Sequence, residues 1–341
     1  MGIQDELART IEALTGEGKG ILAADESTPT CTKRFQAVGI ESTEDSRRAY
    51  RELLVSTRGV GEFVAGVILY EETLHQQAAD GTPLPQKAAE NGIVPGIKVD
   101  KGLAELPNAD GDTITQGLDG LVDRLAQYKQ AGARFAKWRE VYRIGPSNPT
   151  RLGIRANAEV LARYAAACQS QGIVPIVEPE VLIDGEHDMA RCFEVTDAVQ
   201  HAVFHALYRH KVLLEGMVLK PSMVIPGKAS GQQASPEEVA AATLKVLRRN
   251  VPAAVPTINF LSGGQTPEQA TANLNAMNTA GVSRPWYLSF SYARALQEPV
   301  MQLWQGKAEN VAKAQEAFLH RARLNSAAAR GQYRPDMEQA A

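Results

Sequence analysis

The stretch Gly216-Met217-Val218-Leu219-Lys220-Pro221 is a short apolar run that ends in a lysine with a proline directly behind it. Proline disfavours helix for the preceding residue and cannot donate to a central ladder, so we expect a buried strand that stops at Lys220. Burial favours the neutral amine of a lysine, and a neutral amine on a rigid strand end is suited to Schiff-base chemistry. The alternative is a buried stem whose ammonium reaches water.

Apolar runs of this kind recur along the chain and alternate with amphipathic helical segments. Runs rich in Val and Ile suit parallel strands that are buried on both faces. Strand–helix units of parallel type predict an α/β fold, a closed (β/α)8 TIM barrel, with a doubly wound open sheet as the second choice. The eight runs are residues 20–25, 63–70, 94–99, 134–139, 173–178, 217–220, 256–261 and 286–294.

Helix start and stop signals lie between these runs. Ser235-Pro236-Glu237-Glu238 and Thr266-Pro267-Glu268-Gln269 each combine an N-cap, a proline in the first turn and a capping-box residue. Gly132 and Gly172 follow helical spacing and predict left-handed helix ends. We expect one barrel domain over residues 1–331, with one or two extra helices in residues 298–329, and a mobile C-terminal tail over residues 332–341.

Composition excludes several classes of protein. The 341 residues are 22% charged and 44% hydrophobic, with a net charge of −3, so nothing indicates a nucleic-acid or acidic-membrane partner. No apolar stretch approaches a membrane span, and the N-terminus lacks the pattern of a signal peptide. The three cysteines lack CxxC spacing, which argues against disulfides or zinc. We therefore expect a cytoplasmic protein.

Polar residues close most of the apolar runs, and in a barrel such strand ends meet at one mouth. Four of them are cations and two are carboxylates, which favours an anionic, hydroxylated ligand such as a sugar phosphate. The seven residues are Asp25, Lys98, Lys137, Glu178, Lys220, Ser262 and Arg294.

Ser262, Gly263 and Gly264 lie between the seventh run and the helix that begins near Thr266. Glycines allow backbone N–H groups to approach an anion, and a helix start adds partial positive charge. A lone Gly-Gly is usually an ordinary turn, but this place in a barrel is the usual phosphate site. Arg294 would complete the site with a planar guanidinium.

Lys137 and Lys220 are the informative pair, because a neighbouring ammonium and burial both disfavour charging of an amine. Glu178 also precedes a proline and would exchange protons with the reacting atoms. Glu180 should share its face if the strand continues. Because Pro179 interrupts that strand, we expect Glu180 to have an auxiliary role.

With these residues in place, the chain closely resembles the class I fructose-bisphosphate aldolases, the metal-free family that forms a Schiff base. Matching segments follow in family order and cover almost the whole chain. They are residues 20–28 (GILAADEST), 96–102 (GIKVDKG), 135–139 (FAKWR), 175–180 (PIVEPE), 219–221 (LKP), 260–265 (FLSGGQ) and 290–296 (FSYARAL).

The resemblance implies that Lys220 forms an imine with C2 of the ketose, with Glu178 as acid and base. It implies that Asp25 takes the proton of the C4 hydroxyl during C3–C4 cleavage and that Lys137 assists as a cation. No cofactor or metal is implied, and the family is typically a homotetramer. The substrate-binding residues that it implies are Ser262, Gly263, Gly264, Arg294, Lys98, Lys33, Arg34, Arg47 and Ser27.

Two segments depart from the family pattern. Residues 29–32 read PTCT where many relatives carry Gly-Ser; Thr30 keeps a hydroxyl there, while Pro29 stiffens the loop. Relatives from higher organisms often end in a tyrosine that closes over the site, and Tyr333 lies too early for that role. We therefore expect Glu178 and water to serve the enamine step.

Two rival readings remain open from the residues. A metal-dependent aldolase needs converging histidines, and only His201 and His205 share a helical face, without a third ligand. A silent sugar-phosphate-binding or scaffolding barrel would not need a potentially neutral amine beside carboxylates. The sequence leaves open the preference between fructose 1,6-bisphosphate and fructose 1-phosphate.

Overall fold

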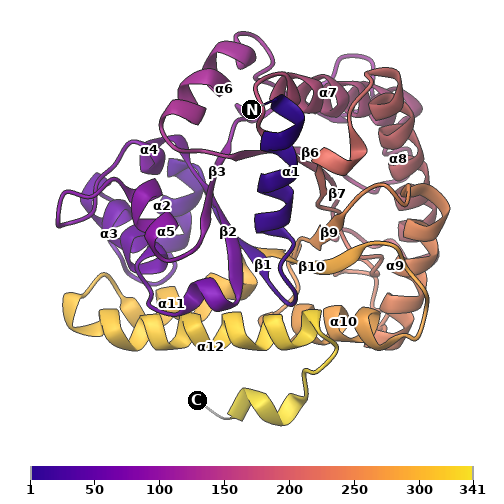
Figure 1. Ribbon diagram of the computed structural model, residues 1–341. Helices are drawn as coiled ribbons and strands as arrows, with labels where there is room; N and C mark the ends of the chain where they lie inside the picture. The colour runs from indigo at the N-terminus through magenta and orange to yellow at the C-terminus, as the bar shows by residue number, and fades with distance from the viewer. Residues whose placement is uncertain (1, 340–341) are drawn as a thin grey trace.

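A computed structural model describes residues 2–339. It contains a closed barrel of parallel strands, with neighbours in the order β1-β10-β9-β8-β7-β6-β3-β2 (Figure 1). Each strand falls on one of the predicted apolar runs, so the predicted TIM barrel is confirmed. The barrel strands are β1 (Gly20–Ala24), β2 (Val64–Leu69), β3 (Val94–Lys98), β6 (Phe135–Tyr142), β7 (Val174–Val181), β8 (Val218–Leu219), β9 (Thr257–Phe260) and β10 (Tyr287–Tyr292).

Helices surround the barrel, and the predicted caps form. Ser235 and Glu238 exchange side-chain and backbone bonds at the start of α9, as Thr266 and Gln269 do at α10. The helices are α1 (Ile3–Leu14), α2 (Thr28–Gln36), α3 (Glu44–Val55), α4 (Glu71–Leu74), α5 (Leu84–Glu90), α6 (Leu121–Gln130), α7 (Arg151–Ser170), α8 (Met189–Arg209), α9 (Pro236–Asn250), α10 (Pro267–Thr279), α11 (Arg294–Trp304) and α12 (Val311–Ala329). None of the described helices has the length and apolar character needed to cross a membrane.

Helix α1 lies across the N-terminal end of the barrel (Figure 1). Its Leu7, Ile11 and Leu14 join the apolar residues of the barrel interior, including Phe135 and Val174 at the starts of β6 and β7. Burying these side chains removes apolar surface from water, which stabilises the closed end. The C-terminal ends of the strands remain as the mouth available for a site.

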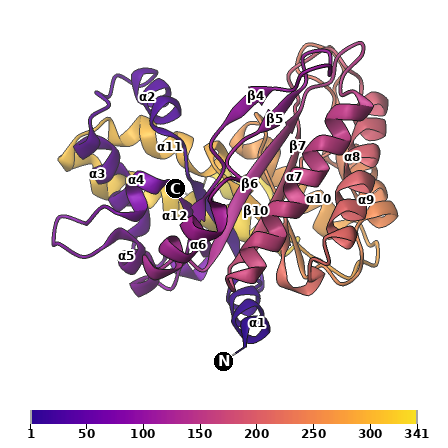
Figure 2. The same ribbon diagram turned by 90° about the horizontal axis from the view of Figure 1, so that it is seen from above.

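Strands β6 and β7 extend further than the sequence predicts. They pair in register from Phe135–Val174 to Tyr142–Val181, so Glu178 lies inside β7 rather than at its end. The ladder with β8 reaches only Val177, so Pro179 occupies an edge position where a missing N–H is tolerated. An antiparallel hairpin that the sequence did not predict, β4 (Leu103–Glu105) and β5 (Thr113–Thr115), lies beside this extension (Figure 2).

Arg294 also differs from its predicted place. Strand β10 ends at Tyr292, and Arg294 is the first residue of α11 rather than the last of a strand. Ala293 precedes that helix without a side-chain cap, so the sequence carries no N-cap signal there. Arg294 still reaches the mouth of the barrel, from a helix start.

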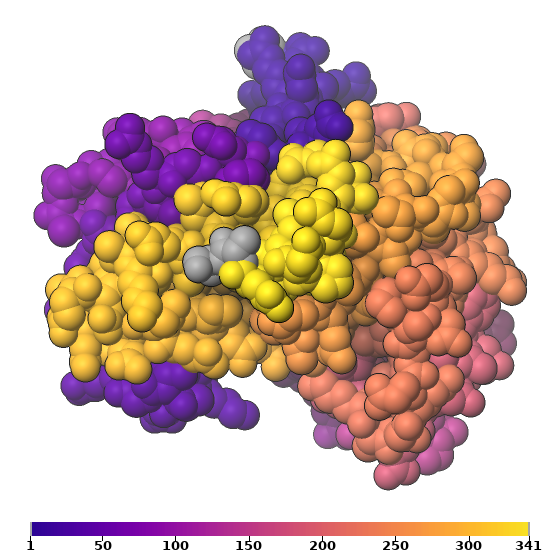
Figure 3. All heavy atoms as spheres, turned by 90° about the horizontal axis from the view of Figure 1, so that it is seen from below, coloured from indigo at the N-terminus to yellow at the C-terminus, as the bar shows by residue number. Residues whose placement is uncertain are grey.

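The segment predicted as a mobile tail is packed against the barrel in its described part, while residues 340–341 lie outside the described residues. Tyr333 is buried, and its N–H donates to Asn275 at 3.0 Å. Glu338, in the 3₁₀ helix Pro335–Gln339, pairs with Arg321 and accepts a hydrogen bond from the Tyr333 hydroxyl. Figure 3 shows this yellow segment seated on the surface made by the C-terminal helices.

Candidate active site

A cavity of about 390 Å³ opens at the C-terminal ends of the strands. Seven of the eight barrel strands, all except β2, contribute residues to its wall from their ends or from the positions directly after them, so residues far apart in sequence meet there. Eleven predicted residues line it: Asp25, Ser27, Arg34, Lys98, Lys137, Glu178, Glu180, Lys220, Ser262, Gly263 and Arg294.

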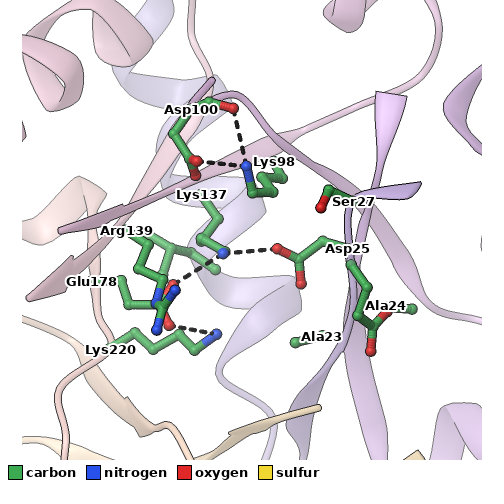
Figure 4. A network of polar contacts seen from close by, with 12 residues as sticks. Ala23, Ala24, Asp25, Ser27, Lys98, Asp100, Lys137, Arg139, Glu178 and Lys220 are labelled. Atoms are coloured by element: carbon green, nitrogen blue, oxygen red, sulfur yellow. Dashed lines mark hydrogen bonds and ion pairs between the residues drawn. The ribbon is translucent and has the colours of Figure 1, made fainter. Parts of the chain in front are cut away.

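Glu178 lies between two lysines at the centre of the cavity (Figure 4). Its Oε1 is 3.1 Å from Lys220 Nζ, and its Oε2 is 3.2 Å from Lys137 Nζ. Lys137 Nζ is also 2.7 Å from Asp25 Oδ2. All four side chains are buried, so each charge depends on the others for compensation.

The electrostatics of this cluster favour ionised carboxylates. Burial alone would raise the pKa of Asp25, but Lys137 and Lys220 outweigh it and lower that pKa to about 2. The same balance lowers the pKa of Glu178. Burial opposes the charge of Lys137, yet Asp25 and Glu178 raise its pKa above the usual lysine range. Lys137 is therefore not the lysine that repulsion and burial bring near neutrality, because two carboxylates lie beside it; that one of the pair is brought near neutrality stays a prediction.

Strand register explains why these side chains meet. Lys98 pairs with Lys137 across β3 and β6, and Arg139 pairs with Glu178 across β6 and β7. Because side chains alternate between the two faces of a strand, Arg139 points to the same side of β6 as Lys137. For the same reason Glu180 points to the same side of β7 as Glu178. Arg139 forms an ion pair with Glu180 and lines the cavity.

Lys98 forms an ion pair with Asp100. Its ammonium donates to the carboxylate of Asp100, and to the Asp100 carbonyl at 3.0 Å (Figure 4). This contact leaves Lys98 at the edge of the cavity, with 17% of its side chain exposed. Asp100 lies two residues beyond Lys98 and is not among the predicted site residues.

The loop after β9 has the backbone expected of an anion site. Gly263 and Gly264 have φ values of +47° and +83°, which glycine adopts without a steric penalty. Helix α10 begins directly behind them with its N-cap at Thr266. A Cβ on Gly264 would lie 3.2 Å from Arg294 Nη2, so the loop and the guanidinium are close neighbours.

A buried network fixes the exit of β1 beside Asp25. Arg51, only 2% exposed, donates to the Ala24 carbonyl at 2.7 Å and to Glu26 Oε2 at 2.9 Å. Arg34 pairs with the other oxygen of Glu26, and Gln297 donates to the same carboxylate at 3.0 Å. Neither Arg51 nor Glu26 is among the predicted site residues: Arg51 has the pattern of an ordinary polar helix residue, and Glu26 lies within the family segment 20–28 without an implied role.

Three predicted residues are absent from the cavity lining: Gly264 lies behind Gly263, Lys33 is exposed on α2, and Arg47 is held by Glu72. The Arg47 guanidinium contacts the two Glu72 oxygens at 2.6 and 2.8 Å. Tyr333 likewise does not line the cavity.

The described residues contain no ligand set for the alternative of a metal-dependent aldolase. His201 and His205 are exposed on α8, and no three His, Cys, Asp or Glu side chains gather as a metal site within residues 2–339. A lone histidine pair is not a metal site.

Comparison with known proteins identifies the family. The family model for fructose-bisphosphate aldolase class-I matches residues 6–341. The chain belongs to the class I aldolases. The resemblance drawn from the sequence segments is therefore confirmed over nearly the whole chain.

Individual relatives agree with this class I aldolase assignment. The cytoplasmic isozyme of fructose-bisphosphate aldolase from Spinacia oleracea is 55% identical, over 96% of this chain and 92% of that protein. The probable class 1 fructose-bisphosphate aldolase of Xanthomonas campestris is 52% identical, over 97% and 99%. The solved fructose-bisphosphate aldolase of Plasmodium falciparum superposes with a TM-score of 0.96 at 50% identity, covering 97% of this chain and 96% of that one.

The chain is accordingly an aldolase of class I and an enzyme of the lyase type. Nothing in the comparisons favours the alternative of a silent sugar-phosphate-binding barrel.

Proposed function

We propose that this aldolase cleaves fructose 1,6-bisphosphate reversibly to dihydroxyacetone phosphate and glyceraldehyde 3-phosphate through a Schiff base on Lys220. The observation that carries the proposal is the contact between the Lys220 ammonium and Glu178, 3.1 Å apart in a buried cavity. A lysine must lose a proton before it attacks a carbonyl. The ionised Glu178 lies within reach of that proton.

The first half of the reaction forms the imine. The neutral Lys220 nitrogen attacks C2 of the ketose, and the carbonyl oxygen becomes the hydroxyl of a carbinolamine. Glu178 returns a proton to this hydroxyl, which leaves as water and gives a protonated imine. Lys137 remains charged throughout, because two carboxylates hold its proton, and it stabilises negative charge that develops nearby.

The second half breaks the C3–C4 bond. Asp25 accepts the proton of the C4 hydroxyl, and the C3–C4 electron pair moves to the protonated imine to give an enamine. The released C4 fragment is the aldehyde product. Protonation of the enamine at C3, for which we assign Glu178 with water, followed by hydrolysis, frees the ketone and restores Lys220. Glu180 acts as an auxiliary that positions Arg139.

The remaining cavity residues divide between the two phosphates. We assign one phosphate to Ser262, Gly263 and Arg294, with the backbone of Gly264 behind them, and the positive φ angles of the two glycines support this assignment. This loop begins beside Lys220, because the Leu261 N–H donates to the Pro221 carbonyl at 3.1 Å. Lys98, Arg34 and Ser27 also line the cavity, and we assign them to the distal phosphate. Lys33 is exposed on α2, so we assign it only a long-range positive potential.

Arg47 has a conditional role in this scheme. Its guanidinium is bound to Glu72, so we assign it a substrate contact only if substrate displaces that carboxylate. The reaction as written uses no cofactor and no metal ion.

The location and assembly of the enzyme are part of the proposal. The names of the spinach relative and of several Arabidopsis relatives place those proteins in the cytoplasm or cytosol, which supports a cytoplasmic enzyme here. We also propose a homotetramer with residues 1–331 as its barrel domain, from the family resemblance. Analytical ultracentrifugation at several protein concentrations measures the mass of the assembly directly and so tests the homotetramer.

Substitution of Lys220 by Met tests the function. We expect cleavage of fructose 1,6-bisphosphate to fall below detection while the variant still binds the sugar phosphate, because only the amine is removed. Substantial remaining turnover in Lys220→Met would refute the assigned nucleophile.

A further inference from the structure

Lys228 lies over the phosphate loop although no catalytic motif includes it. A Cβ built on Gly264 would lie 2.7 Å from Lys228 Nζ and 3.2 Å from Arg294 Nη2. The ammonium and the guanidinium therefore converge on the same point of the loop, one from the segment after β8 and the other from the start of α11.

The backbone around Lys228 is held firmly in this place. Three consecutive N–H groups, of Gly227, Lys228 and Ala229, donate to carbonyls of the loop after β7 at 2.8, 2.8 and 2.9 Å. The approach is so close that a Cβ on Gly227 would lie 2.4 Å from the Gly185 carbonyl oxygen. The position of the Lys228 backbone is thus set by the fold, and only its side chain has freedom.

Neither cation has a strong protein partner. Lys228 Nζ is 3.9 Å from Asp184, and about half of the lysine and most of the aspartate are exposed. Such a surface pair contributes little free energy. Arg294 has no carboxylate within ion-pair distance in the part of the chain that the structure describes. Two cations beside the N–H groups of a glycine loop favour an anion between them.

We infer that Lys228 is a substrate-specificity residue that binds the phosphate on the carbon next to the ketone. The inference rests on the proposed function, because it takes the loop after β9 as the phosphate site. Strand β9 is the neighbour of β8, which leads into Lys220. The phosphate that reaches this loop is therefore the one attached to C1, beside the C2 that reacts with Lys220.

This placement predicts which ligands depend on Lys228. Fructose 1,6-bisphosphate, fructose 1-phosphate and dihydroxyacetone phosphate all carry that phosphate, whereas glyceraldehyde 3-phosphate carries only the distal one. Since the ammonium is partly exposed, its loss should weaken binding about three- to tenfold. The chemical step should be almost unchanged, because Lys228 does not contact the reacting atoms.

The test compares Lys228→Gln and Lys228→Arg in the full-length enzyme. We expect Lys228→Gln to raise KM for both ketoses and the inhibition constant of inorganic phosphate about three- to tenfold, with kcat nearly constant. Lys228→Arg, which keeps the charge, should restore most of the affinity. Lys313→Gln, an exposed lysine of α12 far from the loop in sequence, is the charge-matched control and should behave like wild type.

Arg294→Ala separates the possible failures. Unchanged KM and phosphate inhibition in Lys228→Gln, with a raised KM in Arg294→Ala, would overturn the inference and leave the proposed function intact. Unchanged values in both variants would show that the loop does not bind phosphate, which removes the phosphate assignment itself. An equal loss for glyceraldehyde 3-phosphate in Lys228→Gln would also contradict the inference.

Discussion

Lys137 Nζ lies 2.7 Å from Asp25 Oδ2 and connects β6 to the exit of β1 across the mouth of the barrel. The same ammonium lies 3.2 Å from Glu178, so one buried cation compensates two carboxylates. It sets the protonation of both groups that the mechanism uses as bases. This makes Lys137 an electrostatic residue rather than a second nucleophile.

Replacing Lys137 by Met should shift the pH dependence of catalysis. Without the ammonium, burial would dominate and raise the pKa of Asp25 above its present value of about 2. The acidic limb of the kcat/KM profile should then move to higher pH, while Lys137→Arg should keep it nearer its original position. An acidic limb that does not move in Lys137→Met would contradict the assigned electrostatics.

The same pair predicts how acid affects stability. The folded pKa of Asp25 is depressed, so its contribution to the free energy of unfolding is present above its unfolded pKa and is lost as pH falls toward about 2. Lys137→Met leaves Asp25 without its ion-pair partner and Glu178 with Lys220 alone, and should cost about 3–5 kcal/mol at neutral pH. Urea unfolding between pH 2 and pH 7 measures both effects.

Arg51 and Arg48 provide a matched comparison on one helix. Arg51→Met should cost about 3 kcal/mol or more, because its buried guanidinium holds Glu26 and the Ala24 carbonyl. Arg48 pairs with Glu52 on the more exposed side of α3, so Arg48→Met should cost less than about 1 kcal/mol. Arg51→Met should also lower kcat, since Asp25 lies between Ala24 and Glu26. Equal losses of unfolding free energy in the two variants would contradict the buried network.

Glu140 predicts a pH effect of opposite sign. This fully buried carboxyl accepts bonds from Trp138 Nε1 at 2.9 Å and from the Thr115 N–H at 3.1 Å. Burial outweighs both bonds and raises its pKa to about 8. Its contribution to stability is therefore complete below its unfolded pKa and is lost as pH rises toward about 8.

Glu140→Gln should remove this dependence, because an amide does not titrate. Between pH 5 and pH 8 the free energy of unfolding of the wild type should fall, relative to Glu140→Gln, by at least about 1.4 kcal/mol, the equivalent of one pH unit. Chemical denaturation of both proteins at each pH makes the comparison. Parallel curves for the two proteins would show that Glu140 titrates in its ordinary range.

The barrel could be predicted from the sequence because its strands are buried on both faces and read as continuous apolar runs. Lys220 was placed at a strand end because Pro221 stops the ladder. The predicted end of the last strand was wrong for a local reason. Ala293 gives α11 no side-chain cap, so the sequence pattern continues the preceding strand to Arg294.

Long-range contacts account for what the sequence could not predict. The hairpin of β4 and β5 consists of two three-residue strands without a long apolar pattern. Arg51 reaches β1 only through the packing of α3 on the barrel, and Lys228 reaches Gly264 only because two loops meet. Local sequence patterns carry no information on contacts between segments that are far apart in the sequence.

The central claim is a covalent bond between the nitrogen of Lys220 and C2 of the sugar. The most direct measurement is mass spectrometry of peptides after borohydride reduction of the enzyme in the presence of dihydroxyacetone phosphate. The account predicts a single reduced adduct on the peptide that contains Lys220. An adduct on Lys137 or another lysine, or no adduct while turnover continues, would contradict it.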